Sequence, residues 1–186
     1  MSRLTVYNEN DTETPILDTR DADAISAELD KVGVLFERWP AEHALPADAT
    51  AEQIGEAYAA DIERLQAQFG YQTWDVIGIH PQHPDKDAMR AKFLDEHSHS
   101  EDEVRFFVDG AGLFTLHIGG KVYATLCEAN DLISVPADTH HWFDMGEAPH
   151  FKVIRLFNNQ EGWVAKFTGT DIASEFRPAG EQILGQ

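Results

Sequence analysis

Short apolar runs separated by turn residues characterise the second half of the chain. From residue 104 onward, runs rich in Val, Ile, Leu and Phe alternate with Gly, Pro, Asn and Asp. Such runs predict β-strands, which we expect at 104–108, 113–118, 121–126, 131–135, 150–157 and 162–167. We expect the first strand to end at Asp109 and Gly110, and the pair Gly119 and Gly120 predicts a tight hairpin. Many short strands indicate a sandwich or a barrel, and a jelly roll protects its edges and leaves room for a small ligand.

Two apolar stripes at helical spacing occupy the first half of the chain. They predict a helix over 22–32 and one continuous helix of about five turns between Thr50 and Gly70. Thr50 and Gln53 have the spacing of a capping box, and Gly70 is a typical stop. The other patterned segments predict a strand at 73–79 and a short helix at 87–94. The expected fold class is mainly β with an α-helical N-terminal part.

The amino-acid composition limits the classes of protein to which the chain can belong. The 186 residues are 42% hydrophobic and 25% charged, which is ordinary for one globular domain. We expect a single domain over 1–186, with the helical segment of about 20–70 packed on a barrel. A short tail at about 170–186 is expected either to be disordered or to cover the barrel mouth. Nothing in the pattern indicates a large exposed apolar interface, so a monomer is expected.

Charge and cysteine usage narrow the possible partners. The net charge of −19 argues against a nucleic-acid partner. No apolar run approaches the length of a membrane helix, and the first residues lack the apolar segment of a signal peptide. The single cysteine, Cys127, rules out an internal disulfide framework and fits a reducing compartment. We therefore expect a cytoplasmic protein.

Histidines and a carboxylate at close spacing are the candidate chemistry. His97, His99 and Glu103 lie in EHSHSEDE, and His141 follows in PADTHHW. Three imidazoles and a carboxylate suit a first-row transition metal. They fill four positions of an octahedron, so two adjacent positions can accept a bidentate substrate. A structural zinc site is more often a closed, cysteine-rich tetrahedron. The pattern therefore favours a reactive metal centre.

Strand alternation adds an arginine to this centre. Residues two apart in a strand share a face, so Arg105 is expected on the same side as Glu103. A buried guanidinium needs a charge partner. An anionic substrate is one such partner, and the alternatives are an internal salt bridge or a solvent-facing arginine.

The second histidine segment is ambiguous by pattern alone. His140 and His141 are adjacent and point opposite ways in an extended strand, so only one of them can join the centre. His117 lies in an apolar strand and has no partner at ligand spacing. We expect it to be a hydrogen-bonded histidine rather than a ligand.

Two motifs carry a resemblance to a known superfamily. The stretch 97–110 resembles the first cupin motif. The stretch 136–141 resembles the second, with Asp138 where cupins often have glycine. This resemblance selects His141 over His140. It implies a cupin-type jelly-roll β-barrel.

A longer resemblance is more specific. It rests on the stretch KFLDEHSHSEDEVRFFVDGAGLFTLHI, with YQTWDVIGIHP upstream and ISVPADTHHWFDMG downstream. These segments resemble the acireductone dioxygenases of methionine salvage, over nearly the whole chain. The resemblance implies an oxidoreductase that cleaves 1,2-dihydroxy-5-(methylthio)pent-1-en-3-one with dioxygen. With Fe²⁺ the implied products are 4-methylthio-2-oxobutanoate and formate. With Ni²⁺ they are 3-(methylthio)propanoate, formate and carbon monoxide.

The resemblance also implies roles for individual residues. Arg105 is expected to stabilise negative charge on the substrate. Phe143 shares parity with His141 along the strand, so it is expected to line the substrate pocket, and Trp163 is a second pocket residue. The alternative for both aromatic residues is packing in the core. No general base is evident, although Glu103 is a candidate if it leaves the metal. The implied ligands of one Fe²⁺ or Ni²⁺ ion per chain are His97, His99, Glu103 and His141.

Two other readings compete with this one. The first is another metal-dependent cupin enzyme that acts on a different small enol or a sugar. The second is a cupin module that binds a ligand without catalysis. Wide separation of the four candidate ligands in space would favour the binding module.

Overall fold

Two β-sheets that share one long strand form the body of the protein. A computed structural model describes residues 1–40, 43, 45–46, 48–159 and 164–185. The strands are β1 (Arg3–Asn8), β2 (Leu17–Thr19), β3 (Leu35–Arg38), β4 (Thr73–Ile79), β5 (His97–Ser98), β6 (Glu103–Ile118), β7 (Lys121–Glu128), β8 (Asp131–Val135), β9 (His140–Asp144), β10 (Phe151–Phe157) and β11 (Lys166–Phe167). The helices are α1 (Ala22–Asp30), α2 (Ala51–Ala57), α3 (Ala59–Phe69), α4 (Lys86–Phe93) and α5 (Ile172–Leu184). The predicted class, mainly β with a helical N-terminal part, is confirmed.

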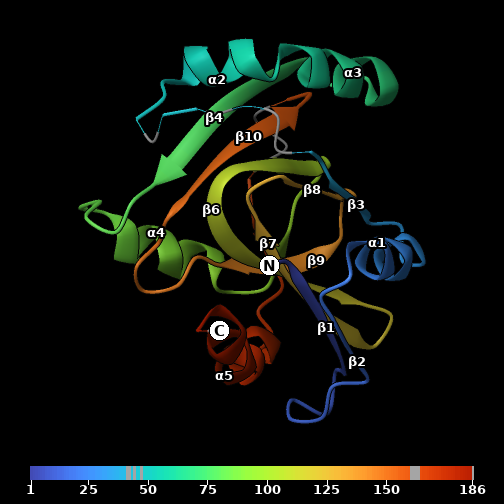
Figure 1. The fold of residues 1–186 in the computed structure, drawn as a ribbon. Helices are drawn as coiled ribbons and strands as arrows, with labels where there is room; N and C mark the ends of the chain where they lie inside the picture. Colours follow the sequence, from blue (N-terminus) through green and yellow to red (C-terminus); the bar gives the residue numbers. More distant parts are fainter. Residues whose placement is uncertain (41–42, 44, 47, 160–163, 186) are drawn as a thin grey trace.

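Strand β6 joins the two sheets (Figure 1). Its first part pairs with β8 and β10, and its second part pairs with β7 and β9. The hydrogen-bonded ladder is not closed into a ring in the part of the chain that the structure describes. The sheet therefore curves around an interior that is lined from both halves of β6.

The prediction that a strand ends at Asp109 and Gly110 is wrong, because β6 runs through both residues. The chain bends there instead. Gly110 has φ +71°, and a Cβ atom at this position would lie 1.8 Å from the carbonyl oxygen of His150. The carboxylate of Asp109 accepts a hydrogen bond from the Gly110 amide at 2.9 Å. Glycine therefore permits a bend within one strand, where the sequence indicated a turn between two.

The single long helix expected after Thr50 is also wrong, because Tyr58 separates α2 from α3. Tyr58 has φ −102° and ψ 15°, outside helical geometry. Its buried ring packs 5.0 Å from that of Phe106, centroid to centroid. A break at this point lets both helices keep apolar residues against a twisted sheet. The predicted capping box of Thr50 and Gln53 is present, and Gly70 ends α3 in the left-handed conformation.

Several strands in the N-terminal third were not anticipated from the pattern. Strand β1 pairs with β7, and β3 pairs with β8, so each is defined by a distant partner. The hairpin at Gly119 and Gly120 is present between β6 and β7. The candidate strand at 162–167 is described only from residue 164, and there only Lys166 and Phe167 are extended.

The C-terminal tail forms helix α5 on the outside of the sheet (Figure 1). Its buried residues Ala173, Phe176 and Ile183 pack in a cluster with Tyr7 and Trp142. Phe143, the next residue of β9, packs in the separate interior cluster. Because neighbouring strand residues face opposite sides, α5 covers the outer face of the sheet.

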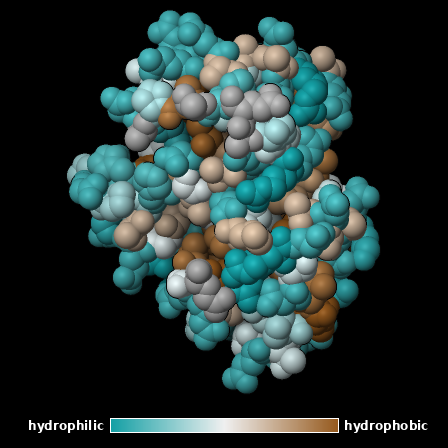
Figure 2. Space-filling model, viewed as in Figure 1, coloured by the Kyte–Doolittle hydropathy of each residue, from teal (hydrophilic) through white to brown (hydrophobic). Residues whose placement is uncertain are grey.

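The face drawn in Figure 2 is mostly hydrophilic, with apolar colour in small patches. Among the described residues, no helix is long and apolar enough to cross a membrane.

Candidate metal centre and substrate cavity

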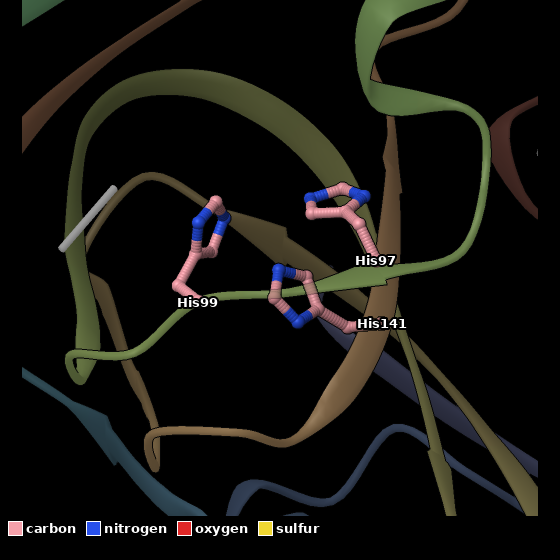
Figure 3. Close-up of side chains that lie close together, drawn as sticks. All are labelled: His97, His99 and His141. Atoms are coloured by element: carbon pink, nitrogen blue, oxygen red, sulfur yellow. The ribbon is translucent and has the colours of Figure 1, made fainter. Parts of the chain in front are cut away.

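Three histidine side chains meet inside the curved sheet (Figure 3). His97 comes from β5, His99 follows that strand, and His141 comes from β9. Potential ligand atoms of the three rings lie within 4.8 Å of one another. Glu103, the first residue of β6, is 3.8 Å from His99 (Oε2 to Nε2) and 2.8 Å from His141 (Oε2 to Nε2). All four side chains are buried. The structure therefore brings together the four residues selected from the sequence.

Strand register explains why His141 joins this group and His140 does not. His97 pairs directly with His141, and Leu116 of β6 pairs with His141 from the other side. His141 therefore points inward, where 2% of the residue is exposed. The side chain of His140 lies on the opposite face and is 50% exposed.

Backbone carbonyls orient two of the imidazole rings. Nδ1 of His97 lies 2.7 Å from the carbonyl oxygen of Asp95, and Nδ1 of His141 lies 2.8 Å from that of Thr139. A carbonyl only accepts, so each Nδ1 carries the proton. Each Nε2 is left with a lone pair for a metal. These orienting contacts had no signal in the sequence, because any residue supplies a carbonyl.

Unpaired polar atoms show that the residues fit a metal ion. Glu103 Oε2, His141 Nε2 and His99 Nδ1 are buried and make no hydrogen bond of acceptable geometry. The 2.8 Å between the first two is close to the distance of about 3 Å expected for two ligands at right angles and about 2.1 Å from one ion. Burying several such atoms without partners costs free energy. A divalent cation bound by Glu103 Oε2 and His141 Nε2 removes that cost for these two atoms, and His99 faces the same position with its Nε2.

The surroundings of His97 and Glu103 favour the protonation states that bind a metal ion. Burial lowers the pKa of His97 to about 4, so its imidazole is neutral at pH 7. Burial also opposes ionisation of Glu103, but Arg105 and His141 outweigh it and hold the pKa of the carboxyl well below its ordinary value. A neutral imidazole and an ionised carboxylate are the forms that bind metals.

Arg105 combines two of the roles considered from the sequence. Its Nε donates to Oε1 of Glu103 at 2.7 Å, and a second guanidinium nitrogen contacts the same oxygen. This is the internal salt bridge. The guanidinium also lines the cavity and lies 5.7 Å from the centre of the Phe114 ring. It thus leaves Oε2 of Glu103 for a metal and presents positive charge to a ligand.

A cavity of about 500 Å³ adjoins the histidines. The four candidate ligands and Arg105 form its polar end, and Phe143 is among its apolar walls. Trp163, the other predicted pocket residue, lies outside the described residues. The lining not anticipated from the sequence is Ile77, Gly78, Ile79, Met89, Lys92, Phe93, Phe151 and Arg155.

Arg155 is the most informative of the residues that sequence reasoning missed. It pairs with Arg105 across β10 and β6, and its guanidinium binds both carboxylate oxygens of Asp75 at 2.8 and 2.5 Å. An arginine inside the apolar run HFKVIRLF was the available signal. It did not reveal that the side chain lies beside the cavity.

Comparison with known proteins agrees with this geometry. Residues 3–165 match the family model described as the ARD/ARD′ family. The chain is 60% identical over 176 residues to an acireductone dioxygenase of Pseudomonas aeruginosa, covering 95% of this chain and 97% of that one. It is 56% identical to one of Klebsiella pneumoniae, covering 95% and 98%.

A solved structure supports the fold. It is an acireductone dioxygenase from Bacillus anthracis with a cadmium ion in its active centre. The TM-score is 0.78 at 29% identity, with 90% of this chain and 98% of that chain covered. The likeness confirms the cupin-type fold class. With the four converging side chains and the match over most of the sequence, it shows that the chain belongs to the acireductone dioxygenase (ARD/ARD′) family.

Proposed function

We propose that this chain cleaves 1,2-dihydroxy-5-(methylthio)pent-1-en-3-one with dioxygen in methionine salvage. The observation that carries the proposal is the cavity itself. One end holds three imidazoles, Glu103 and a guanidinium, and most of the other walls are apolar. That division matches a substrate with an anionic enediol at one end and a methylthioalkyl chain at the other.

We propose that the bound ion is Fe²⁺ or Ni²⁺ and that its ligands are His97, His99, Glu103 and His141. When bound, it supplies Lewis acidity and a template for two adjacent substrate oxygens. We propose 4-methylthio-2-oxobutanoate and formate as products of the iron form. The nickel form is proposed to give 3-(methylthio)propanoate, formate and carbon monoxide.

The protein's own groups bind and orient the substrate. The Arg105 guanidinium offers hydrogen-bond donors to the enolate oxygens at the polar end of the cavity. Phe143 and the other apolar walls bury the methylthio chain and keep water from the reacting carbons. The low pKa of Glu103 makes its carboxylate a weak base, which favours metal binding over the role of general base.

Close grouping of the four candidate ligands argues against a binding module without catalysis, and the cavity walls argue against a sugar substrate. A binding module does not need a cavity in which unpaired ligand atoms converge beside a guanidinium. A different enol or sugar substrate fits the apolar walls less well, since sugars need polar partners. The proposal includes a cytoplasmic monomer whose partners are this substrate and dioxygen.

The test uses metal-free protein reconstituted under anaerobic conditions with Fe²⁺ or Ni²⁺. Acireductone is added in air, its ultraviolet absorbance is followed, and products are identified for each metal. We expect rapid loss of absorbance, formate from both forms, and carbon monoxide from the nickel form alone. Absence of turnover with either metal overturns the proposal. His80→Ala, in an exposed loop outside the cavity lining, is the control for nonspecific effects of removing a histidine.

A further inference from the structure

A second group of metal-ligating side chains lies behind the candidate centre. Glu96, His117 and His140 each offer a ligand atom, and these atoms lie within 4.8 Å of one another. We propose that these three residues form a second, outer site for a transition-metal ion such as Zn²⁺. This inference does not depend on the reaction proposed above, because it concerns metal binding on the opposite face of the sheet.

Strand alternation places the two sites back to back. Glu96 directly precedes His97, and His140 directly precedes His141, so two of the three inner histidines have an outer neighbour on the other face. His117 of β6 pairs in register with His140 of β9. The outer group therefore draws its ligands from the same strands, or their immediate flanks, as the inner group.

The two carboxylate oxygens of Glu96 have different partners. Oε2 accepts from the hydroxyls of Thr168 at 2.6 Å and Thr170 at 2.8 Å. Oε1 faces the histidines, 2.6 Å from Nδ1 of His117 and 3.9 Å from Nδ1 of His140. Glu96 is 2% exposed, and the two threonine hydroxyls orient its carboxylate. Oε1 is therefore a positioned ligand atom at the buried end of the outer site.

A second carboxylate orients His117 from the far side of its ring. Oε2 of Glu9 lies 2.8 Å from Nε2 of His117. A carboxylate that binds one ring nitrogen while the other faces a metal is a recurrent support for histidine ligands. Glu9 thus holds a proton on Nε2, and Nδ1, which contacts Oε1 of Glu96 in the metal-free protein, is the nitrogen that would bind the ion.

The spacing suits a tetrahedral ion after small side-chain movements. Two ligands about 2.1 Å from a tetrahedral ion are about 3.4 Å apart. The separations of 2.6 and 3.9 Å lie on either side of this value. Rotation of the half-exposed His140 side chain would close the longer gap. The shorter gap would widen by about 0.8 Å once the proton that Glu96 and His117 share is displaced. The ion would replace the proton between Glu96 and His117, and that proton would pass to water. A water molecule would be the fourth ligand.

We expect an ion in the outer site to cross-link three segments of the chain. Glu96 flanks β5, His117 lies in β6, and His140 lies in β9. One ion bound to all three ties together the strands that carry the inner histidines and Glu103. Outer-site binding is therefore expected to raise the melting temperature even when the inner site is already filled.

Zinc titration of metal-free protein by calorimetry tests the proposal. We expect wild-type protein to bind a second equivalent of Zn²⁺ after the first. His140→Ala should weaken the second equivalent by at least about tenfold and leave the first unchanged. His141→Ala, its neighbour on the same strand, should weaken the first and leave the second. His80→Ala, which removes the exposed member of a histidine pair in the loop after β4, should change neither.

Two outcomes overturn the inference. One is identical zinc binding by wild type and His140→Ala. The other is loss of the second equivalent in His80→Ala, which would assign it to the loop. The Co²⁺ absorption spectrum gives a second readout, since the outer ion should add an intense tetrahedral band that His140→Ala removes. None of these measurements involves turnover, so failure here is distinct from failure of the proposed reaction.

Discussion

The Nε2 atom of His141 lies 2.8 Å from Oε2 of Glu103, and neither atom makes a hydrogen bond of acceptable geometry. A metal ion bound to both of these buried polar atoms would remove the cost of leaving them unpaired. Metal should therefore stabilise the fold. At a free metal concentration about 100 times the dissociation constant, we expect about 3 kcal/mol of added unfolding free energy. Denaturant unfolding with Ni²⁺ and with a chelator measures it, and equal midpoints in both would contradict the metal centre.

Replacing Arg105 with alanine should impair the enzyme without emptying the metal centre. The guanidinium lines the cavity and binds the Glu103 oxygen that faces away from His141. A charged hydrogen bond lost to the substrate lowers kcat/KM by about ten- to a hundredfold. Metal content, measured in the same sample, should stay near one ion in the inner site. Arg3→Ala, which breaks a surface pair with Asp18, is the control. Complete metal loss in Arg105→Ala would instead assign the arginine a structural role.

His117 makes the stability of the metal-free protein depend on pH. Burial lowers its pKa, but hydrogen bonds to Glu9 and Glu96 outweigh burial and raise the pKa above the ordinary value of 6.5. Its contribution is therefore fully present below about pH 6.5 and is lost as pH rises through the folded-state pKa. His117→Gln should destabilise the protein more at about pH 6 than at about pH 9. Denaturant midpoints in chelator measure this, and an equal loss at both pH values would contradict it.

Gly112 controls the position of Phe143. A Cβ atom at residue 112 would lie 2.3 Å from the ring of Phe143, so Gly112→Ala must displace the ring. We expect a loss of about 1–3 kcal/mol in stability, typical of overpacking, together with a higher KM because Phe143 lines the cavity. Gly180→Ala is the matched control. Its Cβ would meet only the end of the Leu113 side chain, at 3.1 Å. The gain in helix propensity of up to about 1 kcal/mol is set against this tight contact, and the KM should stay unchanged because Leu113 does not line the cavity. Similar kinetics for both variants would separate Phe143 from substrate binding.

Local signals predicted local structure well. The capping box at Thr50, the stop at Gly70 and the strand at 73–79 all depend on residues a few positions apart, and all are present. Predictions failed where tertiary contacts decided the backbone. Tyr58 interrupts a continuous apolar stripe because its ring packs under Phe106, and Gly110 bends a strand because the backbone at His150 approaches closely.

The residues of the candidate site also differ in whether nearby sequence was enough to predict them. His97, His99, Glu103 and Arg105 are close in sequence, so spacing and alternation were enough to group them. Phe143 was anticipated from its parity with His141. Arg155 was not, because only the register of β10 against β6 and β4 places it beside the cavity and pairs it with Asp75.

The sequence by itself determined the chemistry of the ligands, their alternation along each strand and the family to which they point. Only the tertiary structure decided which faces those strands turn inward. Pairing of His97 with His141 buries one histidine of an adjacent pair and leaves His140 to join Glu96 and His117 outside. The physical reason is that side-chain alternation is a property of one strand, whereas its direction depends on register against partners far away in the chain.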